Sequence, residues 1–586
     1  MTRNPCFSCI LVLPIFFFFA FRTSGKDADS HPNVMLISFD TLRADHLRCY
    51  GYERSTSSFL DQLAAEGILF ERCYSQSVST LPSHMSLMTS LYPNSHKVNM
   101  HCARLAEEKI TAAEIFRENG YETVGIYTNP FLQGSFGFKQ GFDLYEGVVD
   151  EFRTQGFEAT KLLTQWAEKR TSDKPFFLFL HYNDAHAPYS PPEGFVRHFD
   201  PDYEGDANGA VETLEKYEDE EVDPRDLAHV QSLYDDEIRY ADAELAKSAA
   251  CMESHGLLEN TIIAFISDHG EEFKEHGRTK HPNVLYNELI HVPLIIKFPT
   301  QMGIKPRRYK GMVKSLDVLP TLLDAAGISP GGNIHQGKSL LPAIREPSRE
   351  ESTNPQVFTE AVDTDCVAII TENMKYIYYP HTRKEELYRL DQDPKEQKNL
   401  AKEEKATCDQ LRPILLEHLS SQTGGWHFRC THPCVVIGEL VTDGVFESVE
   451  SFDFNPKDVF HLNSQKNRIT FHMDARKAAD KMDGLDFRVK DEAYTIRLLL
   501  EEESTVGADA IFLGSRMKNP SSLPLVIEPE NTSDFLAPVG WNLLNMSRKR
   551  PTDGLFLWKQ ENPGATQTFT IDKDTMKRLK SLGYFR

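Results

Sequence analysis

The sequence is short of positive charge. Its 64 lysines and arginines stand against 87 aspartates and glutamates, which leaves a formal net charge of −23 at pH 7. A surface with this balance repels a phosphate backbone, which argues against nucleic acid as a partner. An anionic substrate would have to be held by a local basic pocket instead.

Long hydrophobic runs are also scarce. The one extended run, Cys9 to Phe21, follows Arg3 and precedes the small residues Thr23-Ser24-Gly25. It is shorter than the about 20 apolar residues that a bilayer crossing needs. The pattern predicts a signal peptide at residues 1–25, with an uncleaved anchor as the alternative. We therefore expect a secreted, periplasmic or luminal protein with no stable membrane span after signal removal.

Regular zinc spacing is missing from the cysteines. Cys430 and Cys434 lie too far apart in sequence for a Cys-x-x-Cys pair, although His427 and His432 lie beside them. A disulfide or two buried thiols is therefore favoured over a zinc site. The pairing of the remaining cysteines stays open, because connectivity does not follow from spacing.

Polar residues follow two strongly apolar stretches. Asp40 comes directly after the run 33–39, and Asp268-His269 comes after the run 261–267. Apolar residues at nearly every position are typical of strands buried on both faces of a parallel sheet. Ligands of open α/β sheets bind outside the carboxyl ends of such strands, so these three side chains are expected to meet.

Thr80 lies between these two strands in the sequence. Pro82 suits the first turn of a helix that continues through 83–90, which places Thr80 at a helix N-terminus that favours anions. Two carboxylates, an imidazole and a hydroxyl can hold one divalent cation, which turns the hydroxyl into a nucleophile. Taken singly, each aspartate would merely end a loop and Thr80 would cap a helix; together they predict a metal-dependent site.

Helical and strand patterns alternate along the first 350 residues, which indicates βαβ units and a mostly parallel sheet. The sequence predicts an α/β fold with helices on the sheet, a small antiparallel subdomain and an added β-rich domain, read as a sandwich. The predicted order is a signal peptide (1–25), a catalytic domain (26–354), a small α+β subdomain (355–425), the β-rich domain (426–567) and a helix returning to the catalytic domain (568–586).

Several motifs occur in the order of one known family. They are Ser38 to Asp45, Cys49 to Tyr52, Thr80 to His84, His186 to Tyr189, Ser267 to Glu271, His276-Gly277, Val292 to Ile295 and Glu386 to Pro394. By these motifs the chain resembles the sulfatase family of the alkaline phosphatase superfamily. The resemblance implies an alkaline-phosphatase-like fold and an ester hydrolase.

The departures from that family concern the nucleophile. Sulfatases that use formylglycine carry Cys or Ser in the pattern Cys/Ser-x-Pro-Ser-x-Arg, where this chain has Thr80 and Met85. Threonine cannot be oxidised to that aldehyde, so the usual sulfatase mechanism is unavailable. Asp40-Thr41 and Asp268-His269 look more like the metal clusters of phosphonate monoester hydrolases and of the phosphoglycerol transferases that build lipoteichoic acid.

The resemblance also suggests roles for further residues. Lys280 is similar to the family lysine that contacts the non-bridging ester oxygens. His84 and His186 would orient the substrate or assist proton transfer, although a lone histidine is more often structural. His276 and His281 are weaker candidates, which matter only if a second metal is present.

The combined prediction is a hydrolase in which Asp40, Thr80, Asp268 and His269 ligate one divalent ion. The donor set favours Mn²⁺, Mg²⁺ or Zn²⁺ over Ca²⁺. The predicted reaction is cleavage of a phosphodiester or phosphonate-type ester, or transfer of the phosphoryl group. Hydrolysis of a sulfate ester and a catalytically inactive glycan-binding protein are the alternatives, and a small-molecule, glycan or lipid ester is the expected partner.

Overall fold

The computed structural model describes residues 31–586 apart from short gaps. The gaps are 100–101, 150–154, 330–334, 348–353, 363–365, 381, 423, 432–433, 453–458, 476–481, 491–492, 507–509, 515–516, 538–540, 542, 544–553, 562, 564–565, 583 and 585–586. The predicted signal peptide and His432 lie outside the described residues. Within the described part, no helix combines the length and apolarity needed to cross a membrane.

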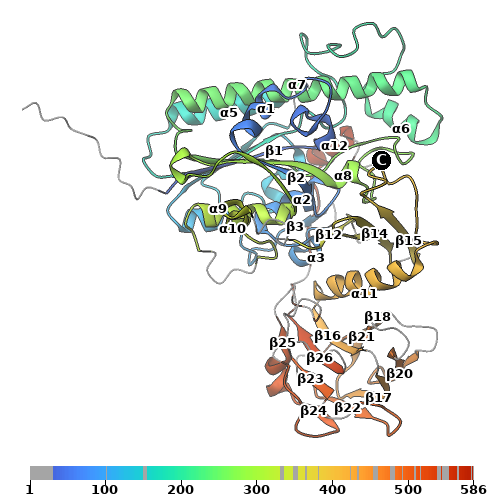
Figure 1. The fold of residues 1–586 in the computed structure, drawn as a ribbon. Coiled ribbons are helices and arrows are strands. Elements are labelled where there is room, and N and C mark those ends of the chain that lie inside the picture. Colours follow the sequence, from blue (N-terminus) through green and yellow to red (C-terminus); the bar gives the residue numbers. More distant parts are fainter. Residues whose placement is uncertain are drawn as a thin grey trace, which may run out of the picture. The chain divides into compact units, whose positions relative to one another are not determined.

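An eight-stranded sheet forms the centre of the larger part of the chain (Figure 1). Its strand order is β11-β2-β10-β7-β1-β6-β4-β5. The strands are β1 (Asn33–Phe39), β2 (Ile68–Tyr74), β4 (Glu122–Tyr127), β5 (Leu144–Gly147), β6 (Phe176–Tyr182), β7 (Thr261–Ser267), β10 (His291–Lys297) and β11 (Arg307–Lys314). Strand β1 pairs in parallel with both β6 and β7, whereas β10 runs antiparallel to β7 and β2. The predicted fold class is confirmed, with β10 as the antiparallel exception.

Helices cover both faces of this sheet because side chains alternate along each strand. Met35 and Ile37 of β1 share a buried cluster with helices α1 (Ser58–Glu66), α5 (Gln155–Lys169) and α7 (Pro224–Ser254). On the opposite face, Val34 and Leu36 share a cluster with α2 (Thr80–Thr89), α4 (Ala112–Glu118) and α9 (Val318–Ala325). Both faces of the central strands are therefore buried against apolar side chains, and polar side chains lie at the ends of the strands.

Two further β regions follow. A four-stranded antiparallel sheet contains β12 (Val357–Glu360), β13 (Val367–Ile370), β14 (Met374–Tyr379) and β15 (Lys384–Arg389), and precedes helix α11 (Lys405–Ser421). Residues 425–560 then form two sheets, ordered β18-β21-β16-β26-β23 and β19-β20-β17-β22-β24. Their strands are β16 (Gly425–Thr431), β17 (Val435–Thr442), β18 (Phe446–Phe452), β19 (Val459–Leu462), β20 (Arg468–Asp474), β21 (Met482–Val489), β22 (Ile496–Leu500), β23 (Ile511–Leu513), β24 (Leu525–Ile527) and β26 (Leu555–Gln560). Both sheets contribute to one apolar cluster, as in a sandwich.

Residues 567–584, called the return segment below, contact the N-terminal part of the catalytic fold. Strand β27 (Gln567–Thr568) pairs antiparallel with β3 (Ala103–Arg104). Helix α12 (Lys573–Ser581) starts at Asp572, whose carboxylate accepts hydrogen bonds from the N–H groups of residues 574 and 575. Leu579 joins the buried cluster that includes helix α2. This anchoring brings Tyr584 close to the carboxyl ends of the central strands.

Candidate active site

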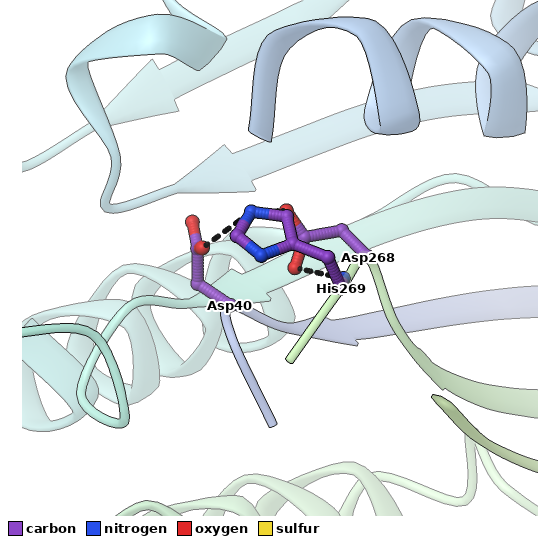
Figure 2. A group of neighbouring side chains, drawn as sticks. All are labelled: Asp40, Asp268 and His269. Atoms are coloured by element: carbon purple, nitrogen blue, oxygen red, sulfur yellow. Dashed lines mark hydrogen bonds and ion pairs between the residues drawn. The ribbon is translucent and has the colours of Figure 1, made fainter. Parts of the chain in front are cut away.

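The ends of β1 and β7 bring three acidic and basic side chains together (Figure 2). Phe39 and Ser267 are partners in the parallel ladder, so Asp40 and the pair Asp268-His269 leave the sheet side by side. One ligand atom from each of the three lies within 4.8 Å of the others. His269 Nε2 is 3.3 Å from Asp268 Oδ2 and 3.9 Å from Asp40 Oδ1. All three side chains are buried.

The backbone after each strand fixes this geometry. Thr41 has a φ of 52°, a left-handed conformation that is uncommon for a residue with a branched side chain. Its N–H donates to Asp268 Oδ1 at 3.1 Å, and its hydroxyl donates to the Ala185 carbonyl at 2.9 Å. A Cβ at Gly270 would lie 2.0 Å from the Glu288 carbonyl oxygen, so only glycine fits directly after His269. The turn after β1 thus orients Asp268, and the close approach at Gly270 fixes the backbone after His269.

Thr80 is the first residue of helix α2, as the position of Pro82 predicts. Its hydroxyl oxygen lies 3.3 Å from Asp40 Oδ1 and 3.4 Å from His269 Nε2. The side chain is fully buried. The helix terminus adds free backbone N–H groups to this region, which favour an anionic ester.

The charge balance of the cluster fits a bound cation. Among the described residues, neither Asp40 nor Asp268 has an ion pair with a lysine or arginine. Burial raises the pKa of the Asp268 carboxyl, but the charges of His269 and His84 outweigh it and hold the pKa below its usual range. Two buried carboxylates, one imidazole and one hydroxyl are a donor set that suits a divalent metal. The cluster can therefore hold one such ion.

His84 lies on the helix side of this cluster. Its Nε2 is 2.9 Å from the Ser38 hydroxyl, its Nδ1 is 2.9 Å from the Thr80 carbonyl oxygen, and Asp268 Oδ2 is 3.3 Å away. Burial lowers the pKa of His84, but the charge of Asp268 raises it by more, so the pKa of His84 lies above its usual value. With both ring nitrogens engaged, His84 positions Thr80 and Asp268.

His186 follows β6 at the same edge of the sheet. Its Nδ1 lies 2.5 Å from the Ala187 carbonyl, while its buried Nε2 has no hydrogen-bond partner in the described part of the chain. Because a carbonyl accepts only, Nδ1 carries the proton, and Nε2 of the neutral ring is an acceptor. Burial lowers the pKa of His186, which keeps this neutral form at neutral pH.

Lys280 and His281 line a cavity of about 300 Å³ together with Tyr584. The Lys280 ammonium lies 3.3 Å from Glu215, whereas the His281 ring lies 4.8 Å from the His269 ring. His281 Nδ1 is 2.6 Å from the buried carboxylate of Glu271. The structure thus brings His281 beside the metal-ligand candidates, while the Lys280 ammonium lies beside the Glu215 carboxylate.

His276 belongs to a different cluster. Its Nδ1 lies 2.5 Å from Glu288, and its Nε2 lies 3.1 Å from the Glu396 carbonyl oxygen. Both ring nitrogens are committed to these contacts.

Three residues at the site are not among the predicted catalytic or metal-ligating residues. Asn129 Nδ2 donates to Asp40 Oδ2 at 2.8 Å, and His181 Nε2 lies 3.3 Å from the same oxygen. Tyr584 places its hydroxyl 2.8 Å from Thr80 Oγ1. Asn129 follows the end of β4, so the strand-end argument used for Asp40 would also have found it; no local pattern points to Tyr584.

Comparison with known proteins assigns the family. The profile described as sulfatase matches residues 32–328, and that of the N-sulphoglucosamine sulphohydrolase C-terminal region matches 275–422. The chain belongs to the sulfatase family and is a hydrolase of that family. Enzymes of this family use a divalent metal, in agreement with the cluster described above.

Individual relatives share the fold over about two thirds of this chain. An arylsulfatase of Clostridium perfringens is 26% identical over 465 residues, covering 67% of this chain and 96% of the relative. A Δ4,5-hexuronate-2-O-sulfatase of Bacteroides thetaiotaomicron is 25% identical, covering 67% and 89%. The crystal structure of a phosphonate monoester hydrolase of Agrobacterium radiobacter superposes with a TM-score of 0.56 at 22% identity, covering 65% of this chain and 93% of that one.

Proposed function

We propose that Thr80 is the nucleophile of a metal-dependent hydrolase that cleaves a phosphodiester or phosphonate-type ester, or transfers its phosphoryl group. The observation that carries this proposal is the position of Thr80 Oγ1, which lies 3.3 Å from Asp40 and 3.4 Å from His269 at a helix N-terminus. A hydroxyl at this point replaces the formylglycine side chain of the usual sulfatase site.

Asp40, Thr80, Asp268 and His269 would hold one ion, with Mn²⁺, Mg²⁺ or Zn²⁺ favoured over Ca²⁺ by the imidazole. When bound, such an ion lowers the pKa of the hydroxyl and offsets negative charge on the ester. The Thr80 oxygen would form a bond to phosphorus while the bond from phosphorus to the leaving oxygen breaks. The proton given up by Thr80 goes to the leaving oxygen, which departs as an alcohol and leaves a threonyl ester of phosphorus.

The second half of the reaction returns Thr80 to its free form. A water oxygen attacks phosphorus, the bond from phosphorus to Thr80 Oγ1 breaks, and Thr80 regains a proton. His186 suits this step because its Nε2, which has no hydrogen-bond partner among the described residues, is an acceptor that can take the proton of the water. An alcohol in place of water would make the same site a transferase. His84 holds Thr80 in place, and Lys280 and His281 line the cavity from which the ester would enter.

Hydrolysis of a sulfate ester is the second candidate. It is favoured by relatives that are named as an arylsulfatase and a hexuronate sulfatase. Both candidates predict a small-molecule or glycan ester as the substrate.

We also propose the predicted domain boundaries for this chain. Both family profiles end by residue 422, which supports an added β-rich domain over 426–567. Its proposed role is to shape the rim of the cleft or to bind a polymer. Secretion into an extracytosolic compartment is proposed from the apolar run in residues 1–25.

The test compares matched aryl sulfate, phosphate monoester, phosphodiester and phosphonate ester. Metal-stripped protein is refilled separately with Mn²⁺, Zn²⁺, Mg²⁺ or Ca²⁺, and Thr80→Ala is assayed beside Thr89→Ala. Thr89 is a matched control because it lies buried on the same helix and its hydroxyl donates to the Met85 carbonyl at 2.7 Å.

Phosphodiester or phosphonate turnover that Thr80→Ala abolishes and Thr89→Ala retains is the expected result. Dominant sulfate turnover would overturn the preference for phosphorus. Full activity of Thr80→Ala would overturn the proposed nucleophile.

A further inference from the structure

The hydroxyl of the proposed nucleophile has one neighbour that belongs to neither the metal cluster nor its strands. Tyr584 OH lies 2.8 Å from Thr80 Oγ1, a contact that joins residues 504 positions apart in the chain. Thr80 is fully buried and does not line the adjoining cavity of about 300 Å³, whereas Tyr584 does. The tyrosine therefore stands at the boundary between the nucleophile and the space available to a substrate.

Hydrogen-bond directions assign a donor role to this tyrosine. Asn129 Oδ1 accepts from the Phe131 N–H at 2.8 Å, which fixes the orientation of the Asn129 amide. Its Nδ2 carries two protons and lies 2.7 Å from Asn183 Oδ1, 2.8 Å from Asp40 Oδ2 and 3.2 Å from Tyr584 OH, so its two short bonds go to the first two. The Thr80 proton points to the Asp40 carboxylate at 3.3 Å, which leaves the Tyr584 proton for the contact with Thr80 Oγ1 at 2.8 Å. The result is a directed chain from phenol to threonine to carboxylate.

The tyrosine ring is held as firmly as its hydroxyl. It packs edge-on against Phe131, with ring centroids 4.5 Å apart, and lies 5.0 Å from the His186 ring. Upstream, Leu579 and Leu582 are buried, and the Thr575 hydroxyl donates to Gln133 at 3.0 Å. Displacing the whole return segment would expose these leucines to water, which opposes its movement as a free lid.

We propose that Tyr584 is a catalytic residue, which the return segment adds to the site to donate a hydrogen bond to the Thr80 oxygen. This inference rests on the proposed role of Thr80 as nucleophile. Its effect is greatest when the threonyl ester is hydrolysed: the bond from phosphorus to Oγ1 breaks, negative charge develops on Oγ1, and a preorganised donor stabilises that charge. During the first step the same oxygen must give its lone pair to phosphorus, so the donor helps formation of the ester less than its breakdown.

The experiment measures steady-state and pre-steady-state turnover of a nitrophenyl phosphodiester by the full chain with Mn²⁺. Tyr584→Phe removes only the hydroxyl and keeps the contact with Phe131. Tyr121→Phe is the matched control, because Tyr121 is buried and its hydroxyl donates to the Pro32 carbonyl at 3.0 Å, away from the cluster. Thermal unfolding of each variant is recorded to establish that it folds.

The expected result for Tyr584→Phe is a kcat lowered by about 100-fold, as for loss of one preorganised donor, with a much smaller change in KM. A burst of one nitrophenolate per site should appear, because breakdown slows more than formation. In Tyr584→Ala, added phenol should restore part of kcat, and toluene should not. Tyr121→Phe should retain wild-type kinetics.

Unchanged or raised kcat in Tyr584→Phe, without a burst, would overturn the inference, and a raised value would instead identify the segment as an inhibitory cap. The two proposals fail separately. If Thr80→Ala is inactive and Tyr584→Phe behaves like wild type, only the role of Tyr584 fails. If Thr80→Ala is active, the proposed function itself fails.

Discussion

Two regions of this protein bury carboxylates in opposite ways. At the end of the central sheet, Asp40 and Asp268 are buried with imidazoles and hydroxyls but, within the described residues, without a lysine or arginine partner. Between helix α11 and strand β16, the buried guanidinium of Arg429 lies 3.2 Å from Glu417 and 2.6 Å from Asp486. The Phe452 ring covers this guanidinium at 3.7 Å.

The difference separates a functional cluster from a structural one. Desolvating charges costs several kcal/mol for each ion, and this cost is offset only by well-placed opposite charge. The Arg429 cluster supplies its own cation and is complete as folded. The Asp40 cluster carries two acids without a lysine or arginine partner among the described residues, and it can hold a cation that would supply the compensating charge.

The largest expected effect is a loss of activity when one acid of the Asp40 cluster is changed. Asp268→Asn keeps an oxygen that can accept from the Thr41 N–H but removes the negative charge. We expect turnover to fall by about 1,000-fold or more, because the metal is no longer held. The unfolding free energy of the metal-free protein should fall by only about 1 kcal/mol, because losing the charge that His269 and His84 stabilise is partly offset by losing its repulsion with Asp40. Kinetics and chemical denaturation with and without Mn²⁺ test this. Strong destabilisation of the metal-free form would contradict the distinction between the Asp40 cluster and the Arg429 cluster.

The next largest expected effect is a loss of stability when the Arg429 cluster is changed. Arg429→Met leaves Glu417 and Asp486 without their cation, and we expect a loss of about 3 to 5 kcal/mol in unfolding free energy. Trp426, Trp541 and Trp558 all lie in this part of the chain, so tryptophan fluorescence during denaturation reports on it directly. Turnover per folded molecule at low temperature should stay at the wild-type level. Arg429→Lys keeps the charge but not the fork geometry, so its unfolding free energy should lie between those of wild type and Arg429→Met.

The smallest expected effect concerns His276, which, like Arg429, lies beside an acidic partner, Glu288. Burial lowers the pKa of His276, but the hydrogen bond and charge of Glu288 outweigh it and raise the pKa to about 9. A raised folded-state pKa contributes stability that is complete below the unfolded value of about 6.5 and is lost as pH rises through about 9. Relative to His276→Gln, wild type should therefore be more stable by about 2 kcal/mol at pH 6 and lose that advantage by pH 10. Denaturation of both proteins from pH 6 to 10 measures it; an advantage that grows with pH would contradict the assignment.

Much of the site could be located from the sequence because its positions follow from strand ends. Asp40, Asp268 and His269 each come directly after a run that is apolar on both faces, and parallel pairing of those runs brings them together. The position of Thr80 could be predicted because Pro82 marks the start of a helix. These arguments need only local pattern and one topological rule.

Other features depend on information that no local pattern carries. Lys280 ends the two-residue strand β9 (Thr279–Lys280) with a φ of 62°, and beyond this turn the His281 ring lies beside the His269 ring while the Lys280 ammonium lies beside Glu215. Tyr584 is further removed, because its place beside Thr80 depends on the pairing of β27 with β3 and on the burial of Leu579. Tertiary packing, and not propensity, determines both.

The separation of 504 residues between Thr80 and Tyr584 orders events during synthesis of the protein. At about 5–20 residues per second, Tyr584 is added roughly 25 to 100 seconds after Thr80. By then the strands that carry Asp40 and Asp268 have long been made. A chain that has not yet reached residue 584 therefore already carries the residues of the cluster but lacks the hydroxyl that contacts Thr80.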